Sequence, residues 1–257
     1  SELLNKLIAE NGKISRISMT ILMNERVKGK MNEKKADFKI NYHPPKIYLE
    51  QDYPQEGMEI LYVDGKNNNK AWINPNTFPW VTLSLDPTGN TMRGKHHHSI
   101  FNSGFDYFVN VVKHLMTKYN HEIDKLAKNA GVEFLDGVKC HKIIFENPYF
   151  HFVDYKIKPG EDIVSIASKF YVNEYMIIEN NKGINDYEDI KTGQVIKVPS
   201  DYARKVTIYL HSDTYLPYCI RAYDDAGLFQ EYYFKNVRIN PYFSSAVFSP
   251  NNPEYNF

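Results

Sequence analysis

Four groups of residues combine side-chain types that can carry out metal, nucleophilic or acid–base chemistry. They are His96–His98, Cys140 with His141, Glu161 with Asp162, and Asp224 with Asp225. Adjacent histidines suggest metal ligands, an adjacent thiol and imidazole suggest a nucleophilic dyad, and paired carboxylates suggest general acid–base catalysis. Each suggestion depends on whether the surrounding element turns these side chains toward one another.

The expected elements argue against catalysis. Adjacent residues of an extended strand point to opposite faces, so at most His96 and His98 can share an ion, and Cys140 cannot bond His141. No Asp, Glu or Cys nearby completes a usual ligand set, so we interpret the histidines as a loop or a solvated strand end. The carboxylate pairs fall at a helix start and a hairpin turn. We therefore predict no catalytic residues, no metal site and no cofactor.

The composition excludes several classes of protein. The 257 residues hold 31 basic and 31 acidic side chains, and this zero net charge argues against a nucleic-acid partner. Two cysteines are too few for a disulfide scaffold. No apolar run is long enough to cross a bilayer, so we expect no transmembrane segment. The first residues do not resemble a signal peptide, so an exported protein would have its signal outside this sequence.

The elements that must position any site are mainly strands. Aromatic residues make up 14% of the chain, and short alternating apolar segments separated by turn residues run from residue 14 to 85 and again from 140 to 239. Such spacing predicts hairpins and an antiparallel sheet. A short helix is expected at residues 3–10, and a three- and four-residue apolar repeat from Phe101 to Leu126 predicts one long helix. The fold class is α+β, mainly antiparallel β.

Residues 154–200 have a different pattern, and we expect them to fold as a self-contained strand–helix–helix–strand block. The key segments are Tyr155–Phe170, with Gly160 at the turn into the first helix, and Ile190–Pro199. Asp162 and Asn173 occupy N-cap positions. The block resembles a lysin motif (LysM), which implies a βααβ domain inserted between residues 1–153 and 201–257.

The lysin-motif resemblance implies binding of N-acetylglucosamine-containing glycan, either peptidoglycan or a chitin-like polymer. Carried over position by position, it assigns the glycan-binding groove to Gly160, Glu161, Asp162, Ile163, Asn181, Lys182, Gly183 and Ile184. The alternative is purely structural: Asp162 caps its helix and Asn181 ties a turn.

The remaining residues resemble the lipoprotein-carrier (LolA/LolB-like) half-barrel and a related bacterial family of unknown function. The resemblance rests on residues 93–100, 216–227 and 231–240 and on the aromatic C-terminal segment. It implies a curved sheet with the long helix as a lid and a hydrophobic pocket beneath it. The candidate pocket residues are Tyr42, Tyr62, Trp72, Trp80, Phe101, Phe105 and Tyr218. A filled core is the alternative for these aromatics.

Together the two resemblances imply a non-enzymatic, exported protein of the bacterial periplasm or cell envelope. Its LysM domain would bind peptidoglycan, and its half-barrel would bind a lipid, a lipoprotein or another protein. Two alternatives remain open: an accessory or catalytic component of cell-wall remodelling that LysM targets to its substrate, and a purely structural scaffold.

Overall fold

The computed structural model describes residues 2–78, 80–94 and 96–257, so Ser1, Pro79 and Lys95, the last within the 93–100 segment, lie outside the description. In the described chain, eleven strands form one antiparallel sheet in the order β6-β5-β4-β3-β2-β1-β13-β12-β11-β8-β7. These strands are β1 (Arg16–Val27), β2 (Lys30–Asn41), β3 (Lys46–Tyr53), β4 (Met58–Val63), β5 (Ala71–Asn74), β6 (Leu83–Leu85), β7 (Ala127–Leu135), β8 (Val138–Glu146), β11 (Lys205–His211), β12 (Pro217–Asp224) and β13 (Gly227–Ile239).

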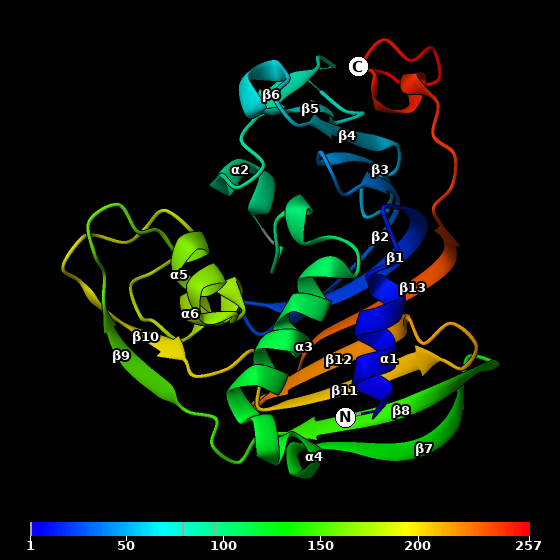
Figure 1. Cartoon of the computed structure of the whole chain (residues 1–257). Coiled ribbons are helices and arrows are strands. Elements are labelled where there is room, and N and C mark those ends of the chain that lie inside the picture. Colours follow the sequence, from blue (N-terminus) through cyan, green and yellow to red (C-terminus); the bar gives the residue numbers. More distant parts are fainter. Residues whose placement is uncertain (1, 79, 95) are drawn as a thin grey trace.

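The sheet joins two meanders through its central strands. Strands β1 to β6 follow one another in space as in sequence, and β13 pairs with β1 to connect the later strands to them. The edge strands β6 and β7 are not neighbours, so the barrel is not closed. In Figure 1 the sheet curves around α1 (Glu2–Asn11) and α3 (Asp106–Tyr119), which cover its inner face. The predicted mainly antiparallel α+β class is confirmed.

The helical cover is shorter and more broken than predicted. Helix α3 ends at Tyr119, because Asn120 has a φ of 22°. The chain then forms η3 (Asn120–Glu122) and α4 (Ile123–Leu126) before it enters β7. Four more short helical segments are η1 (Asn67–Asn69), α2 (Asn90–Arg93), η2 (Ile100–Asn102) and η4 (Ser245–Phe248). No helix in the described chain is both long and apolar enough to span a membrane.

Residues 152–199 form a βααβ unit with its own two-stranded sheet. It consists of β9 (Phe152–Lys156), α5 (Ile163–Phe170), α6 (Glu174–Glu179) and β10 (Val195–Pro199). Both predicted caps are present, since Asp162 accepts a hydrogen bond from the Ser165 amide and Asn173 accepts from the amides of Tyr175 and Met176 in the first turn of α6.

The unit shares its hydrophobic core with the large sheet. Val27 at the end of β1 and Phe229 on β13 belong to the same buried cluster as Ile166 and Met176 of the unit. The backbone amide of Lys28 also donates a hydrogen bond to the buried hydroxyl of the unit's Tyr175. The expectation of a self-contained block therefore differs from the structure, because the unit closes its core against host residues.

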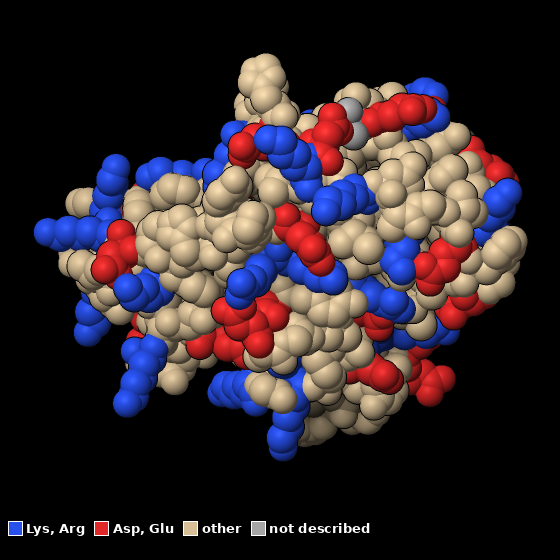
Figure 2. Space-filling view, turned by 90° about the horizontal axis from the view of Figure 1, so that it is seen from below, with Lys and Arg blue, Asp and Glu red and all other residues tan. Residues whose placement is uncertain are grey.

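The C-terminal segment covers the part of the sheet's outer face that β3, β4 and β5 form. The ring of Tyr255 stacks on Tyr48 of β3 with centroids 4.0 Å apart, and Phe248 and Phe257 pack beside them. On the face shown in Figure 2, basic and acidic side chains are interspersed, as expected for a chain with no net charge.

Candidate ligand-binding site

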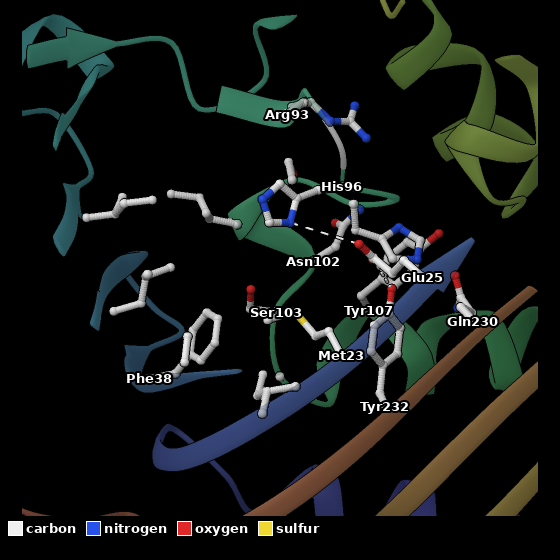
Figure 3. Close-up of a pocket in the computed structure, with 18 of the residues that line it drawn as sticks. Met23, Glu25, Phe38, Arg93, His96, Asn102, Ser103, Tyr107, Gln230 and Tyr232 are labelled. Carbon is white, nitrogen blue, oxygen red and sulfur yellow. Dashed lines mark hydrogen bonds and ion pairs between the residues drawn. The ribbon is translucent and has the colours of Figure 1, made fainter. Parts of the chain in front are cut away.

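A cavity of about 100 Å³ lies between the inner face of the sheet and the segment that leads from α2 into α3. Its wall on the sheet side is mostly apolar and comes from neighbouring strands: Ile21, Met23, Ala36, Phe38, Leu49, Met58 and Ile60. Polar side chains line the other end: Glu25, Arg93, His96, His98, Tyr202, Gln230 and Tyr232. In Figure 3, Phe38 lies toward one side, and Glu25, Gln230 and Tyr232 gather at the other with His96 between them.

The buried carboxylate of Glu25 organises the polar end. One oxygen accepts from the hydroxyl of Tyr232 and from the backbone amide of His97, and the other accepts from Lys34 Nζ at 3.0 Å. Burial disfavours the charged carboxylate, but the charges of His97 and Lys34 outweigh this effect and hold the pKa of Glu25 well below its usual range. Glu25 is therefore a fixed, fully hydrogen-bonded negative charge.

Asn173 fixes the orientation of the neighbouring amide and imidazole groups. Its Oδ1 accepts from the backbone amides of Tyr175 and Met176, so its Nδ2 is the group that faces Gln230 Oε1 at 2.9 Å and His98 Nε2 at 3.2 Å. Because Nδ2 is a donor, His98 Nε2 must carry the lone pair. The neutral ring of His98 then holds its proton on Nδ1.

The ring of His97 contributes a positive charge to this network. It is fully buried between the rings of Tyr175 and Phe229, with centroids 4.7 and 4.3 Å away. Its Nδ1 faces Gln230 Oε1 at 2.9 Å and its Nε2 faces the carbonyl oxygen of Arg26 at 2.8 Å. A ring that donates from both nitrogens is an imidazolium. The interpretation of the histidines as a solvated loop is thus not what the structure shows, because two aromatic rings enclose His97.

His96 and His98 are neutral neighbours of this charged ring. Burial lowers the pKa of His96 to about 4 and that of His98 to about 3. Lys34 Nζ lies 2.9 Å from His96 Nδ1, and since an ammonium only donates, His96 keeps its proton on Nε2. In Figure 3 this second nitrogen faces the apolar side of the cavity.

Arg93 connects the cavity to the βααβ unit. Its Nη2 donates to the carboxylate of Glu174 and to the carbonyl of His97, and its guanidinium carbon lies 3.5 Å from the centroid of the Tyr187 ring. Burial raises the pKa of Glu174 to about 7 against the lowering effect of Arg93. Two nitrogens of Arg93, Nε and Nη1, have no hydrogen-bond partner in the described chain.

The arrangement favours binding over catalysis. The ionised groups are paired with one another, and the thiols of Cys140 and Cys219 are buried and unpaired in another cluster on β8 and β12. Burial raises the pKa of Cys140 to about 11 and that of Cys219 to about 12, which disfavours a nucleophilic thiolate. Within residues 2–78, 80–94 and 96–257, no three His, Cys, Asp or Glu side chains are grouped to hold a metal ion.

None of the seven aromatics predicted to line the pocket is among the residues that line this cavity. Phe105 is fully buried, and Tyr42 and Tyr62 also lie in the main core, with the Tyr42 hydroxyl accepting from the Phe105 amide. Trp72 packs with the C-terminal segment and Tyr218 with the cysteines on the outer face. Trp80 is 70% exposed and Phe101 40% exposed. Strand alternation was therefore misread at Trp72 and Tyr218, which lie on the outer face. Aliphatic side chains and other aromatics, such as Phe38 and Phe108, form the apolar lining.

The residues predicted to bind glycan lie on the two loops beside α5 and α6. Gly160, Lys182 and Gly183 are exposed and Glu161 is half-buried, whereas Ile163 and Ile184 are buried in the unit's core and cannot present an apolar face to a sugar. Asp162 is exposed and caps α5, and Asn181 bonds the backbone of Ile177 and Lys197. The structural roles considered for these last two residues are therefore present.

Sequence reasoning missed Glu25, Arg93 and Glu174. A signal for Glu25 existed, since the inward alternation of Ile17, Met19, Ile21 and Met23 places residue 25 on the same face. A carboxylate at an inward position demands a buried partner. The pairing of Arg93 with Glu174 spans 81 residues, and no local pattern indicates it.

Several solved structures are similar to this chain at low identity. Lipoprotein LppX from Mycobacterium tuberculosis has 11% identity over 94% of this chain and 97% of that one, with a TM-score of 0.44. A putative outer membrane lipoprotein-sorting protein domain from Vibrio parahaemolyticus has 9% identity over 96% of each chain and a TM-score of 0.36. The matched chain in the MucA/MucB complex of Pseudomonas aeruginosa has 11% identity and a TM-score of 0.43. The match covers 96% of the present chain but only 59% of the chain in the complex.

No curated protein matches the sequence. One family model, described as a protein of unknown function (DUF1571), matches residues 14–151 and 174–257. Because these two segments make up most of the sequence, the chain belongs to the DUF1571 family.

Proposed function

We propose that this chain is a non-enzymatic binding protein of the bacterial cell envelope that holds the apolar part of a lipid or acylated ligand beneath its curved sheet. The observation that carries the proposal is the cavity itself, which has an aliphatic wall from four neighbouring strands and one polar end. Ligand sites in proteins have this character, with apolar walls and a few fixed polar groups that orient the ligand.

The cavity's size sets the part of the ligand that it can enclose. An engineered protein cavity of about 150 Å³ holds benzene, so a space of about 100 Å³ encloses part of one acyl chain rather than a whole phospholipid. Met23, Met58 and Met92 line the space, and methionine side chains adjust readily to ligands of different length. The rest of a longer ligand would extend out of the cavity.

A competition experiment with a cavity-filling variant tests the proposal. Decan-1-ol and sodium decanoate should displace an environment-sensitive fluorescent fatty-acid analogue from the wild-type protein. Ala36→Leu adds three carbon atoms to the cavity wall and should weaken binding of the analogue at least tenfold. Ala9→Leu adds the same atoms to an exposed position of α1 and should leave binding unchanged. Equal binding by wild type and Ala36→Leu would remove the cavity from the account.

Glycan binding by the βααβ unit is a second candidate, and it would tether the protein to peptidoglycan. It is supported by the strand–helix–helix–strand order and by the exposure of Gly160, Lys182 and Gly183 on adjoining loops. Sedimentation with insoluble peptidoglycan and chitin tests it. Lys182→Glu should reduce sedimentation, while Lys191→Glu, at another exposed position, should not. If neither ligand class binds, a scaffold role is left, and clearing of a wall suspension by the protein would instead indicate cell-wall remodelling.

A further inference from the structure

The polar end of the cavity contains hydrogen-bond donors that lack acceptors. His96 carries its proton on Nε2, which has no partner in the described chain and faces the apolar side of the cavity in Figure 3. Nε and Nη1 of Arg93 and Nδ1 of His98 are also without partners, although these two side chains are only 1% and 9% exposed. Buried donors without acceptors are rare in native structures and call for a specific explanation.

The two strongest acceptors at this end, the carboxylate of Glu25 and the amide oxygen of Gln230, already accept hydrogen bonds. Both oxygens of Glu25 accept hydrogen bonds, from Tyr232, Lys34 and the His97 amide. Gln230 Oε1 accepts from Asn173. The Glu25 carboxylate and the Gln230 amide oxygen are thus engaged within the network, whereas N–H groups of Arg93 and His98 have no acceptor in the described chain.

The donors also share a positive electrostatic environment. The ammonium of Lys34 donates to Nδ1 of His96, which polarises the ring and strengthens the Nε2–H donor on its far side. The guanidinium of Arg93 adds a charge that cannot be removed by deprotonation. Hydrogen bonds from such groups to an ionised oxygen are about twice as strong as bonds to a neutral one.

From these contacts we infer that the cavity selects single-chain amphiphiles with an anionic oxygen head group, a carboxylate or a phosphate, which accepts from His96 Nε2 while the chain lies against Met23 and Phe38. The inference rests on the proposed function and specifies its ligand class. Arg93 and His98 line the same cavity, and their N–H groups without acceptors are further donors at this end.

A comparison of ligands that differ only in the head group tests the inference without altering the protein. Calorimetric titration at pH 7.5 with decanoate, decyl phosphate, methyl decanoate and decan-1-ol should show the two anions binding at least tenfold more tightly than the two neutral compounds. Equal affinities would overturn the anionic selectivity and leave the proposed function intact. Binding of none of the four would instead overturn the proposed function.

Two further experiments test whether His96 contacts the head group and whether a free anion binds in place of an amphiphile. His96→Leu should lower the affinity for decanoate about tenfold and leave that for decan-1-ol within twofold, and His96→Gln, which restores an N–H donor, should recover part of the loss. An unchanged affinity of His96→Leu for decanoate would remove His96 as the head-group contact. Inorganic phosphate at the decanoate concentration should not compete, and full competition by it would show a free-anion site in place of an amphiphile site.

Discussion

Arg93 at the end of α2 and Glu174 at the start of α6 form an ion pair whose side chains are only 1% and 3% exposed. The pair ties the segment that carries the three histidines to the βααβ unit, and the ring of Tyr187 covers the guanidinium. The unit therefore holds two lining residues of the polar end in place, since Glu174 pairs with Arg93 and Asn173 bonds Gln230.

Removing one member of this pair should destabilise the protein strongly. Glu174→Ala leaves the buried guanidinium without its counter-charge, and the expected loss is about 3–5 kcal/mol in the free energy of unfolding. The double variant Arg93→Met with Glu174→Met removes both charges and should lie closer to the wild type. Urea unfolding followed by circular dichroism measures both. A Glu174→Ala protein as stable as the wild type would show that the pair is not formed in solution.

Excision of residues 152–199 should abolish cooperative unfolding of the remaining chain. The deletion would expose Phe229 and Val27, which are buried against the unit. It would also remove Glu174, the counter-charge of Arg93, and Asn173, which donates to Gln230. The family match, which resumes at residue 174, also includes α6 and β10. Differential scanning calorimetry of the deleted chain checks this expectation, and a sharp transition near the wild-type temperature would show that the host folds without the unit.

Stability should fall as the pH drops from about 6.5 toward 4. His96 and His98 have folded pKa values of about 4 and 3, below the ordinary 6.5, so the stability that their neutral forms provide is present above pH 6.5 and is lost as they are protonated. The slope is at most about 1.4 kcal/mol per pH unit for each ring.

A variant comparison isolates the histidine contribution. Glu174 acts in the opposite direction, because its raised pKa makes its contribution decline between about pH 4.5 and 7. Melting temperatures of His98→Gln should therefore depend less steeply on pH than those of the wild type below pH 6.5. His121→Gln, at an exposed position, should keep the wild-type slope. Identical slopes in all three proteins would contradict the buried neutral state of His98.

The fold was predictable where local patterns decide the structure. Alternation in the strands, the turn residues and the caps at Asp162 and Asn173 specify their elements through neighbours a few residues away. The break at Asn120 was not predictable, because the apolar repeat continues through it from α3 into α4.

The sequence predicted the location of the cavity but not the residues that form its polar end. A cavity beneath a curved sheet follows from the half-barrel resemblance, but its polar end depends on contacts between residues far apart in sequence. His97 meets Gln230 across 133 residues, and Arg93 meets Glu174 across 81. The histidine run reads as solvated by itself, since nothing adjacent to it in sequence indicates the rings of Tyr175 and Phe229 that bury it.

The most direct test of acyl-chain binding in the cavity is an NMR titration of the protein with methyl-labelled methionines. The seven methionines include three that line the cavity, Met23, Met58 and Met92, and two that report on other regions, the exposed Met31 and the unit-core Met176. Decanoate should shift the methyl signals of the three lining residues and leave those of Met31 and Met176 in place. Unchanged lining signals, or shifts confined to Met31 or Met176, would contradict binding beneath the sheet.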